Sequence, residues 1–144
     1  MVYGGGVVDY RVRRHSRWRY TTCMDTGAPR SHAPYREERP WGYFEQFTHN
    51  EPTTVKLLTV LPGARLSLQY HEKREECWRV VAGNGTVELN GEVLPCTVGD
   101  AFTILPLAEH RLIGGTETLV VLEVAYGEFD EDDIVRVADV YGRT

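Results

Sequence analysis

Turn residues interrupt the sequence from residue 42 onward at intervals too short for helices. The apolar, β-branched runs between them end at Pro62-Gly63, Gly83, Asn90-Gly91 and Val98-Gly99-Asp100. Turn signals that recur about every 8–12 residues, without a helical period between them, are typical of an all-β sandwich or barrel. The sequence therefore predicts an all-β fold. One short helical segment is expected at residues 132–137, where acidic residues favour a helix start.

Two segments of opposite charge divide the 144 residues. Residues 1–37 carry seven Arg and three acidic residues, whereas residues 38–144 carry nine basic and eighteen acidic ones. We expect residues 1–37 to form a flexible, basic N-terminal extension and residues 38–144 to form a single folded domain. Two alternatives stay open: the extension is an arm for nucleic acid or membranes, or Met24 is the true start of the protein.

Composition excludes several classes of protein. No stretch reaches the roughly 18 apolar residues that a membrane span needs, and no secretory leader is recognisable. The net charge of −5 and the pI of about 5.5 argue against nucleic acid as the main partner. Three cysteines without a CxxC pair indicate a reducing compartment. The sequence predicts a cytoplasmic protein with no nucleic-acid or membrane partner.

Two of the five histidines belong to a pattern that suits a metal site. Gln69 and His71 lie two residues apart on one strand, so their side chains share a face, and Glu76 begins the next strand. His110 begins a later strand. Imidazole, carboxylate and amide oxygen together form a mixed N/O site for a divalent ion such as Zn, Mn, Fe, Co or Ni. Such a site leaves coordination positions open for a substrate.

The spacing of these residues resembles the first motif of the cupin family. Gly63 is followed by five residues, then Gln69-Tyr70-His71, four residues, Glu76, six residues and Gly83, with Gln in place of the family's first His. A second motif runs from Gly99 to His110, where Leu107 replaces a glycine and predicts an altered turn. The resemblance implies a single-domain cupin, a double-stranded β-helix or jelly-roll barrel, that binds one metal ion through Gln69, His71, Glu76 and His110.

Within the cupins, the chain resembles the C-terminal domain of type II mannose-6-phosphate isomerases, which are often fused to mannose-1-phosphate guanylyltransferase. The resemblance is carried by Arg39-Pro40-Trp41-Gly42, by Pro62 to His71, and by a closing segment that ends in Tyr141-Gly142-Arg143. It implies a metal-dependent sugar-phosphate aldose–ketose isomerase that converts mannose 6-phosphate to fructose 6-phosphate. Zinc is the first expectation for the metal, and a homodimer is the expected assembly.

Further residues receive roles under this interpretation. Glu123, on a late strand, is the candidate base, and a buried paired carboxylate is the alternative. The phosphate needs cations, best supplied by Arg in bidentate geometry. Arg143 is the first choice by resemblance. The other candidate substrate-binding residues are Arg65, Arg74, Arg111 and, in the same closing segment as Arg143, Tyr141.

Some residues depart from the family pattern and keep other functions open. Glu72, Lys73 and Cys77 stand where the family carries a His-rich loop. The alternatives are a non-catalytic cupin that binds a sugar or sugar phosphate, and another metal-dependent cupin enzyme such as a dioxygenase. We interpret the acidic run 128–133 as a solvated face and helix start. Both Trp41 and Trp78 adjoin predicted strands, so we expect them to anchor the core.

Overall fold

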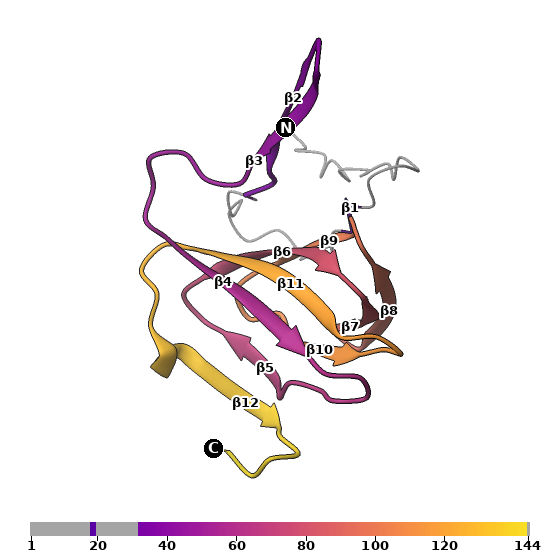
Figure 1. Cartoon of the computed structure of the whole chain (residues 1–144). Coiled ribbons are helices and arrows are strands. Elements are labelled where there is room, and N and C mark those ends of the chain that lie inside the picture. The colour runs from indigo at the N-terminus through magenta and orange to yellow at the C-terminus, as the bar shows by residue number, and fades with distance from the viewer. Residues whose placement is uncertain (1–17, 20–31, 144) are drawn as a thin grey trace, which may run out of the picture.

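Two five-stranded sheets form the body of the protein in a computed structural model that describes residues 18–19 and 32–143 (Figure 1). The first sheet has the order β1 (Trp18–Arg19), β9 (Ala101–Ile104), β6 (Glu75–Ala82), β11 (Leu119–Tyr126) and β4 (Thr53–Val60). The second has the order β12 (Ile134–Ala138), β5 (Leu68–His71), β10 (His110–Gly114), β7 (Asn84–Leu89) and β8 (Glu92–Thr97). The all-β prediction is confirmed.

A separate hairpin of β2 (Tyr35–Arg39) and β3 (Gly42–Gln46) extends away from these sheets (Figure 1). Trp41 lies at its turn and is 72% exposed, so the prediction that this residue anchors the core is wrong. Most of residues 1–37 lie outside the described part of the chain. The predicted division into an extension and a domain therefore stays a prediction.

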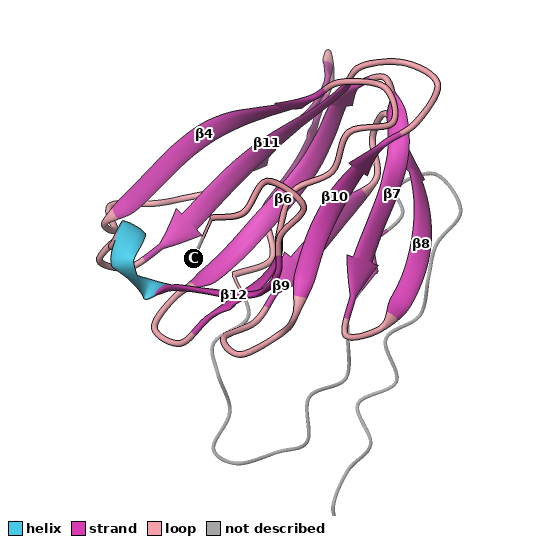
Figure 2. Cartoon of the chain, turned by 90° about the horizontal axis from the view of Figure 1, so that it is seen from below, coloured by secondary structure: helices cyan, strands magenta, loops and turns pink. Residues whose placement is uncertain are grey.

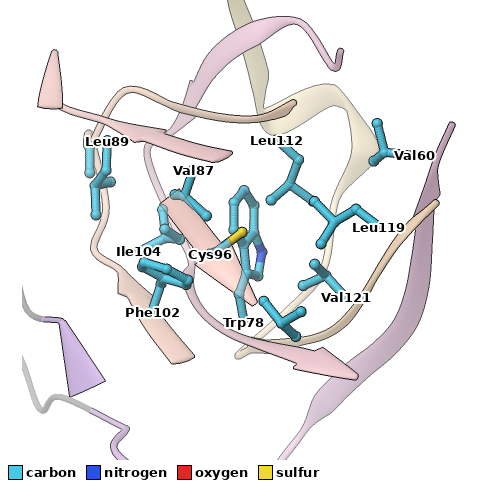
Figure 3. Close-up of a cluster of buried hydrophobic side chains, with 12 residues drawn as sticks. Val60, Trp78, Val87, Leu89, Cys96, Phe102, Ile104, Leu112, Leu119 and Val121 are labelled. Carbon is cyan, nitrogen blue, oxygen red and sulfur yellow. The ribbon is translucent and has the colours of Figure 1, made fainter. Parts of the chain in front are cut away.

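Strand alternation sends apolar side chains to the interior between the two sheets. Along β6, Trp78 and Val80 point inward, and Val121 of β11 and Leu112 of β10 meet them. Figure 3 shows Trp78 in the middle of this cluster of buried side chains. Trp78 is 1% exposed, which confirms its predicted role as a core anchor. Its burial with the surrounding aliphatic side chains stabilises the barrel because apolar surface leaves water.

The C-terminal segment forms a strand where a short helix is predicted. The described residues contain one 3-10 turn, Glu131–Asp133, which is the cyan element in Figure 2. The Asp130 side chain accepts a hydrogen bond from the Asp132 N–H. β12 follows at once and pairs with β5, with Ile134 opposite His71. Pairing with an existing strand satisfies the backbone of this segment better than an isolated short helix would. The predicted C-terminal helix is therefore wrong.

Two turns decide how the strand ends are placed. Asn90 and Gly91 adopt φ values of 48° and 81°, which confirms the predicted two-residue hairpin between β7 and β8. The sequence predicts an altered turn at Leu107, because leucine replaces the family's glycine there. Leu107 nevertheless adopts a φ of 66°, the left-handed conformation that glycine favours. The Leu107 N–H donates to the His71 carbonyl at 2.6 Å. This bond ties the loop before β10 to the end of β5.

No helix among the described residues has the length and apolar character needed to cross a membrane.

Gly83 and Gly91 provide a matched test of the packing. Both have a positive φ, but a Cβ on Gly83 would lie 2.0 Å from the Thr118 carbonyl oxygen, whereas one on Gly91 would meet nothing within 4 Å. We expect Gly83→Ala to lower the free energy of unfolding by about 3 kcal/mol, the sum of backbone strain and overpacking. Gly91→Ala carries the strain alone and should cost about 1 kcal/mol. Denaturant unfolding measures both, and equal losses would contradict the packing described here.

Candidate metal centre

Three of the four predicted metal ligands converge between the two sheets. His71 ends β5, Glu76 lies near the start of β6 and His110 begins β10. One ligand atom from each lies within 4.8 Å of the others, and all three side chains are buried. Because inward positions alternate, Glu76 follows Trp78 and Val80 along β6 toward one end of the barrel. We call this end, defined by His71, Glu76 and His110, the polar end.

The His110 ring is oriented as a metal ligand. Its Nδ1 lies 2.8 Å from the Ala108 carbonyl oxygen, and because a carbonyl only accepts, Nδ1 carries the proton. The lone pair is therefore on Nε2, which is buried and has no hydrogen-bond partner among the residues that the structure describes. Burial also lowers the pKa of His110, so the ring is neutral. A backbone carbonyl that holds one ring nitrogen while the other faces the ion is the usual support of a metal-binding histidine.

His71 completes a nitrogen pair with His110. The two ring centroids are 4.9 Å apart, and His71 Nε2 lies 3.2 Å from Glu76 Oε1. Burial lowers the pKa of His71 to about 4, so this ring is also neutral at pH 7. Two neutral imidazoles and one carboxylate suit a divalent ion of the zinc and iron group. These residues therefore fit the metal that the sequence predicts.

Arg74 lies against the same three groups and is 4% exposed. Its Nε donates to Glu76 Oε1 at 2.8 Å, and its Nη2 lies 3.1 Å from His71 Nε2. A guanidinium only donates, so the lone pair of His71 also points into the cluster. Arg74 balances the charge of Glu76 in this buried setting. The structure thus places this predicted substrate-binding residue directly beside the candidate metal ligands.

Gln69, the fourth predicted ligand, lies on the same face of the second sheet. It pairs with His110 across β5 and β10, so the two side chains point to the same side. Its Oε1 accepts a hydrogen bond from Ser67 Oγ at 2.7 Å. This bond uses one of the two lone pairs of the Gln69 oxygen, and the role of Gln69 as a ligand stays a prediction.

Trp78 connects the metal cluster to Glu123. Its indole N–H lies 3.2 Å from Glu76 Oε2 and 3.2 Å from Glu123 Oε2. Its ring meets the His110 ring edge-on, with centroids 5.2 Å apart. Burial, and then the negative charge of Glu76, raise the pKa of Glu123 to about 7. Glu123 is therefore both a buried carboxylate and a group that gains and loses a proton near neutral pH.

The other predicted substrate-binding residues lie away from the metal cluster or form no hydrogen bond or ion pair with its described residues. Arg65 bridges to Ile113, toward the opposite end of β10 from His110. Arg111 alternates with His110 and forms an ion pair with Glu88 at 2.6 Å. Arg143 binds Asp139, and neither it nor the 58%-exposed Tyr141 makes a hydrogen bond or ion pair with the described residues of the metal cluster. Their assigned roles stay predictions.

Sequence reasoning missed residues near the polar end. Lys56 of β4 lies opposite Glu123 of β11, and its signal was a charged residue in an otherwise apolar run. Asp133 is buried, and its carboxylate accepts hydrogen bonds from the Glu72 and Lys73 backbone N–H groups at 3.1 and 3.2 Å. Phe129 is half-buried against Arg74. The interpretation of residues 128–133 as a solvated face is therefore wrong for Phe129 and Asp133.

A family of known domains matches this fold and site. Its description reads mannose-6-phosphate isomerase C-terminal, and it matches residues 28–139. The chain belongs to this family. A Klebsiella pneumoniae protein with a double-stranded β-helix domain has a similar structure, with a TM-score of 0.54 and 18% identity over 78% of this chain and 90% of that one. The predicted cupin barrel is confirmed.

Two relatives show how much of a larger protein the chain represents. The xanthan biosynthesis protein XanB of Xanthomonas campestris is 43% identical over 122 residues, which cover 81% of this chain and 26% of XanB. The mannose-1-phosphate guanylyltransferase ManC of Salmonella typhimurium is 42% identical over 115 residues, which cover 78% of this chain and 24% of ManC. The chain therefore spans about a quarter of the length of these relatives.

These names contradict the functional prediction. The relatives are named for xanthan biosynthesis and for guanylyl transfer to mannose 1-phosphate, and neither is named an isomerase. The assignment as a sugar-phosphate aldose–ketose isomerase acting on mannose 6-phosphate is therefore corrected. Its physical reason is that the motifs behind it specify a barrel and its metal ligands, and one barrel supports many reactions.

The metal centre predicts a specific loss of binding. We expect His110→Gln to weaken Zn²⁺ and Mn²⁺ binding by more than about 100-fold, because a ligand is lost rather than one of its supporting partners. His49→Gln is the matched control, since that side chain is exposed and outside the cluster. Calorimetric titration measures both affinities, and circular dichroism checks the fold. Unchanged affinity in folded His110→Gln would contradict the assignment.

The shared indole predicts a shift in Glu123. The Trp78 N–H favours the ionised carboxylate and lowers the pKa of Glu123, in opposition to burial. Trp78→Phe removes this donor and should raise the pKa of Glu123 further above 7, so the group stays protonated to higher pH. Carbon-13 NMR of the labelled glutamate carboxyls follows the titration, and the exposed Trp41→Phe serves as the control. A lower pKa in Trp78→Phe would refute the role of the indole.

Proposed function

We propose that this chain is a divalent-metal-binding cupin domain that carries out acid–base chemistry on a small, oxygen-rich ligand. One observation carries the proposal: two buried neutral imidazoles and a carboxylate converge within 4.8 Å, and the indole of Trp78 links that carboxylate to a second one, Glu123. A metal site and a separate proton-transferring group are the two components that such chemistry needs.

His71, Glu76 and His110 would hold the metal, with zinc as the first expectation and Mn, Fe, Co and Ni compatible with the same donors. When bound, the ion supplies Lewis-acid polarisation of a ligand oxygen. Three protein ligands are the number found in catalytic zinc sites, which keep a position open. Metal analysis of the purified protein identifies the ion.

Glu123 acts as the proton acceptor and donor of the site. Its carboxylate lies on the inward face of β11, and its pKa near 7 allows it to take up and return a proton at neutral pH. Lys56, opposite it on β4, lowers that pKa and keeps part of the population ionised. Glu76 and Arg74 neutralise one another nearby, so the charge that changes during turnover is that of Glu123.

The relatives support a phosphorylated sugar as the ligand. ManC is named for mannose 1-phosphate, and XanB is named for the synthesis of a polysaccharide. A sugar phosphate supplies hydroxyl and carbonyl oxygens for the metal and an anionic group for nearby cations. The proposed reaction class is general acid–base proton transfer on the bound ligand, and the relatives' names do not extend it to a particular conversion.

We further infer a cytoplasmic location and a homodimer. Cys96 is a free thiol in the apolar core around Trp78, and Cys77 is a free thiol in a second buried cluster, which suits a reducing compartment. The β2–β3 hairpin supports the dimer, because three of its aromatic side chains, Trp41, Tyr35 and Tyr43, are exposed. Analytical ultracentrifugation measures the assembly.

Deuterium exchange tests the proposed chemistry. We expect the metal-loaded protein in D₂O to exchange a carbon-bound proton of a hexose phosphate, with a rate that rises with pH through about 7 as Glu123 ionises. Glu123→Gln should slow exchange by about 100-fold or more, because general base catalysis contributes that much. NMR follows the exchange, mannose 1-phosphate is included among the hexose phosphates because a relative is named for it, and the chelator-treated protein is the negative control.

Two results would contradict the proposal. Exchange at the wild-type rate in Glu123→Gln would remove that residue as the proton acceptor. Saturable ligand binding to the metal-loaded protein without exchange in any of the hexose phosphates would identify a binding module instead of an enzyme.

A further inference from the structure

A strap of residues 128–133 lies against two cations at the polar end of the barrel. Its C-terminal anchor is buried Asp133, which holds the backbone of the β5–β6 loop through two hydrogen bonds. The preceding residues present one aromatic ring and one carboxylate to the barrel. These groups belong to Phe129 and Glu131, and both face Lys56.

Lys56 and Arg74 come from different strands and meet on the strap. Lys56 Nζ donates to Glu131 Oε1 at 2.8 Å, and Arg74 Nη1 donates to the Asp130 carbonyl oxygen at 2.8 Å. The two cations also lie 4.0 and 4.4 Å from the centroid of the Phe129 ring. The strap therefore satisfies one N–H group on each cation, and these groups lie side by side around a single ring.

The other groups of Arg74 are used inside the barrel. Nε binds Glu76 and Nη2 contacts His71, so Nη1 is the donor that faces the strap. Lys56 lies opposite Glu123 across the β4–β11 pair. The two strap-facing donors thus lie next to the candidate metal ligands on one side and the candidate base on the other. A group bound to these donors would be held beside the proposed reaction site.

The contact between Lys56 and Glu131 is exchangeable. Their side chains are 33% and 64% exposed, and exposed ion pairs contribute little to stability. Lys56 lowers the pKa of Glu131 by hydrogen bonding, with added effects of the Arg74 and Arg136 charges, so the carboxylate is ionised. The strap thus places an anion on a cationic surface without binding it tightly.

We propose that Lys56 and Arg74 form an oxyanion-binding subsite, and that Glu131 of the strap occupies it as an internal competitor that a phosphate group displaces. The inference rests on the proposed function in taking the polar end as the ligand site. A phosphate offers several acceptor oxygens and two negative charges, so one group can satisfy both donors that Asp130 and Glu131 satisfy separately. The Asp133 anchor confines the movement to residues 128–132.

Phosphate titration of the full chain tests the subsite without metal. Calorimetry with inorganic phosphate, in the presence of a chelator, gives the dissociation constant for wild type and variants. We expect Glu131→Gln to bind phosphate about threefold to tenfold more tightly, because the internal competitor loses its charge. Lys56→Gln should bind at least tenfold more weakly, as expected for loss of a hydrogen bond to a charged group, and Lys56→Arg should retain binding.

Glu128→Gln is the matched control, because it removes the same charge from an exposed position on the same strap. Its phosphate affinity should stay within twofold of wild type. Equal tightening in Glu128→Gln and Glu131→Gln, or unchanged affinity in folded Lys56→Gln, would overturn the subsite. Thermal unfolding verifies each fold, and the Glu131→Gln comparison decides the question even where Lys56→Gln does not fold.

Methyl phosphate distinguishes the sources of the oxyanion. Binding at least as tight as that of inorganic phosphate assigns the subsite to a phosphate ester, and weaker binding assigns it to the free ion. Zinc titration of the same variants separates this inference from the proposed function. Phosphate binding without zinc binding would contradict the metal centre alone. Zinc binding without phosphate binding would contradict the subsite alone.

Discussion

The single N–H group of Trp78 is shared by two buried carboxylates, and the arrangement of the polar end depends on it. The indole ring belongs to the apolar cluster, whereas its nitrogen reaches Glu76 and Glu123 at 3.2 Å each. The same ring packs edge-on against His110. One side chain therefore fixes the boundary between the apolar and polar parts of the interior. Burial and the negative charge of Glu76 raise the pKa of Glu123 to about 7, and the shared indole N–H opposes that rise.

Burial of so many polar groups needs compensation. His71, Glu76 and His110 are each at most 2% exposed, and an isolated buried charge would cost several kcal/mol. Arg74 offsets the charge of Glu76, and low pKa values keep the two imidazoles neutral. Within the described part of the chain, the Nε2 of His110 still has no hydrogen-bond partner. A buried acceptor of this kind is a cost to folding, and a metal ion would convert it into a bond.

The fold was predictable because its determinants are local. Turn residues and alternation predict the strands, and the spacing of His71, Glu76 and His110 predicts which side chains meet. Lys56 escaped prediction because its partner Glu131 lies 75 positions away and no pattern links them. The helix expected at Asp132 is replaced by a 3-10 turn because the next residues pair with β5. The prediction that Trp41 anchors the core failed because it rested only on a neighbouring strand. That strand belongs to the β2–β3 hairpin and not to the barrel.

The account's central claim is that the polar end of the barrel binds a divalent ion through His71, Glu76 and His110. Anomalous diffraction from crystals of the full chain grown with Zn²⁺ or Mn²⁺ tests it most directly. The account predicts one strong anomalous peak bonded to two imidazole nitrogens and one carboxylate oxygen of these residues. An ion bound elsewhere, with no peak between the two histidines, would contradict it.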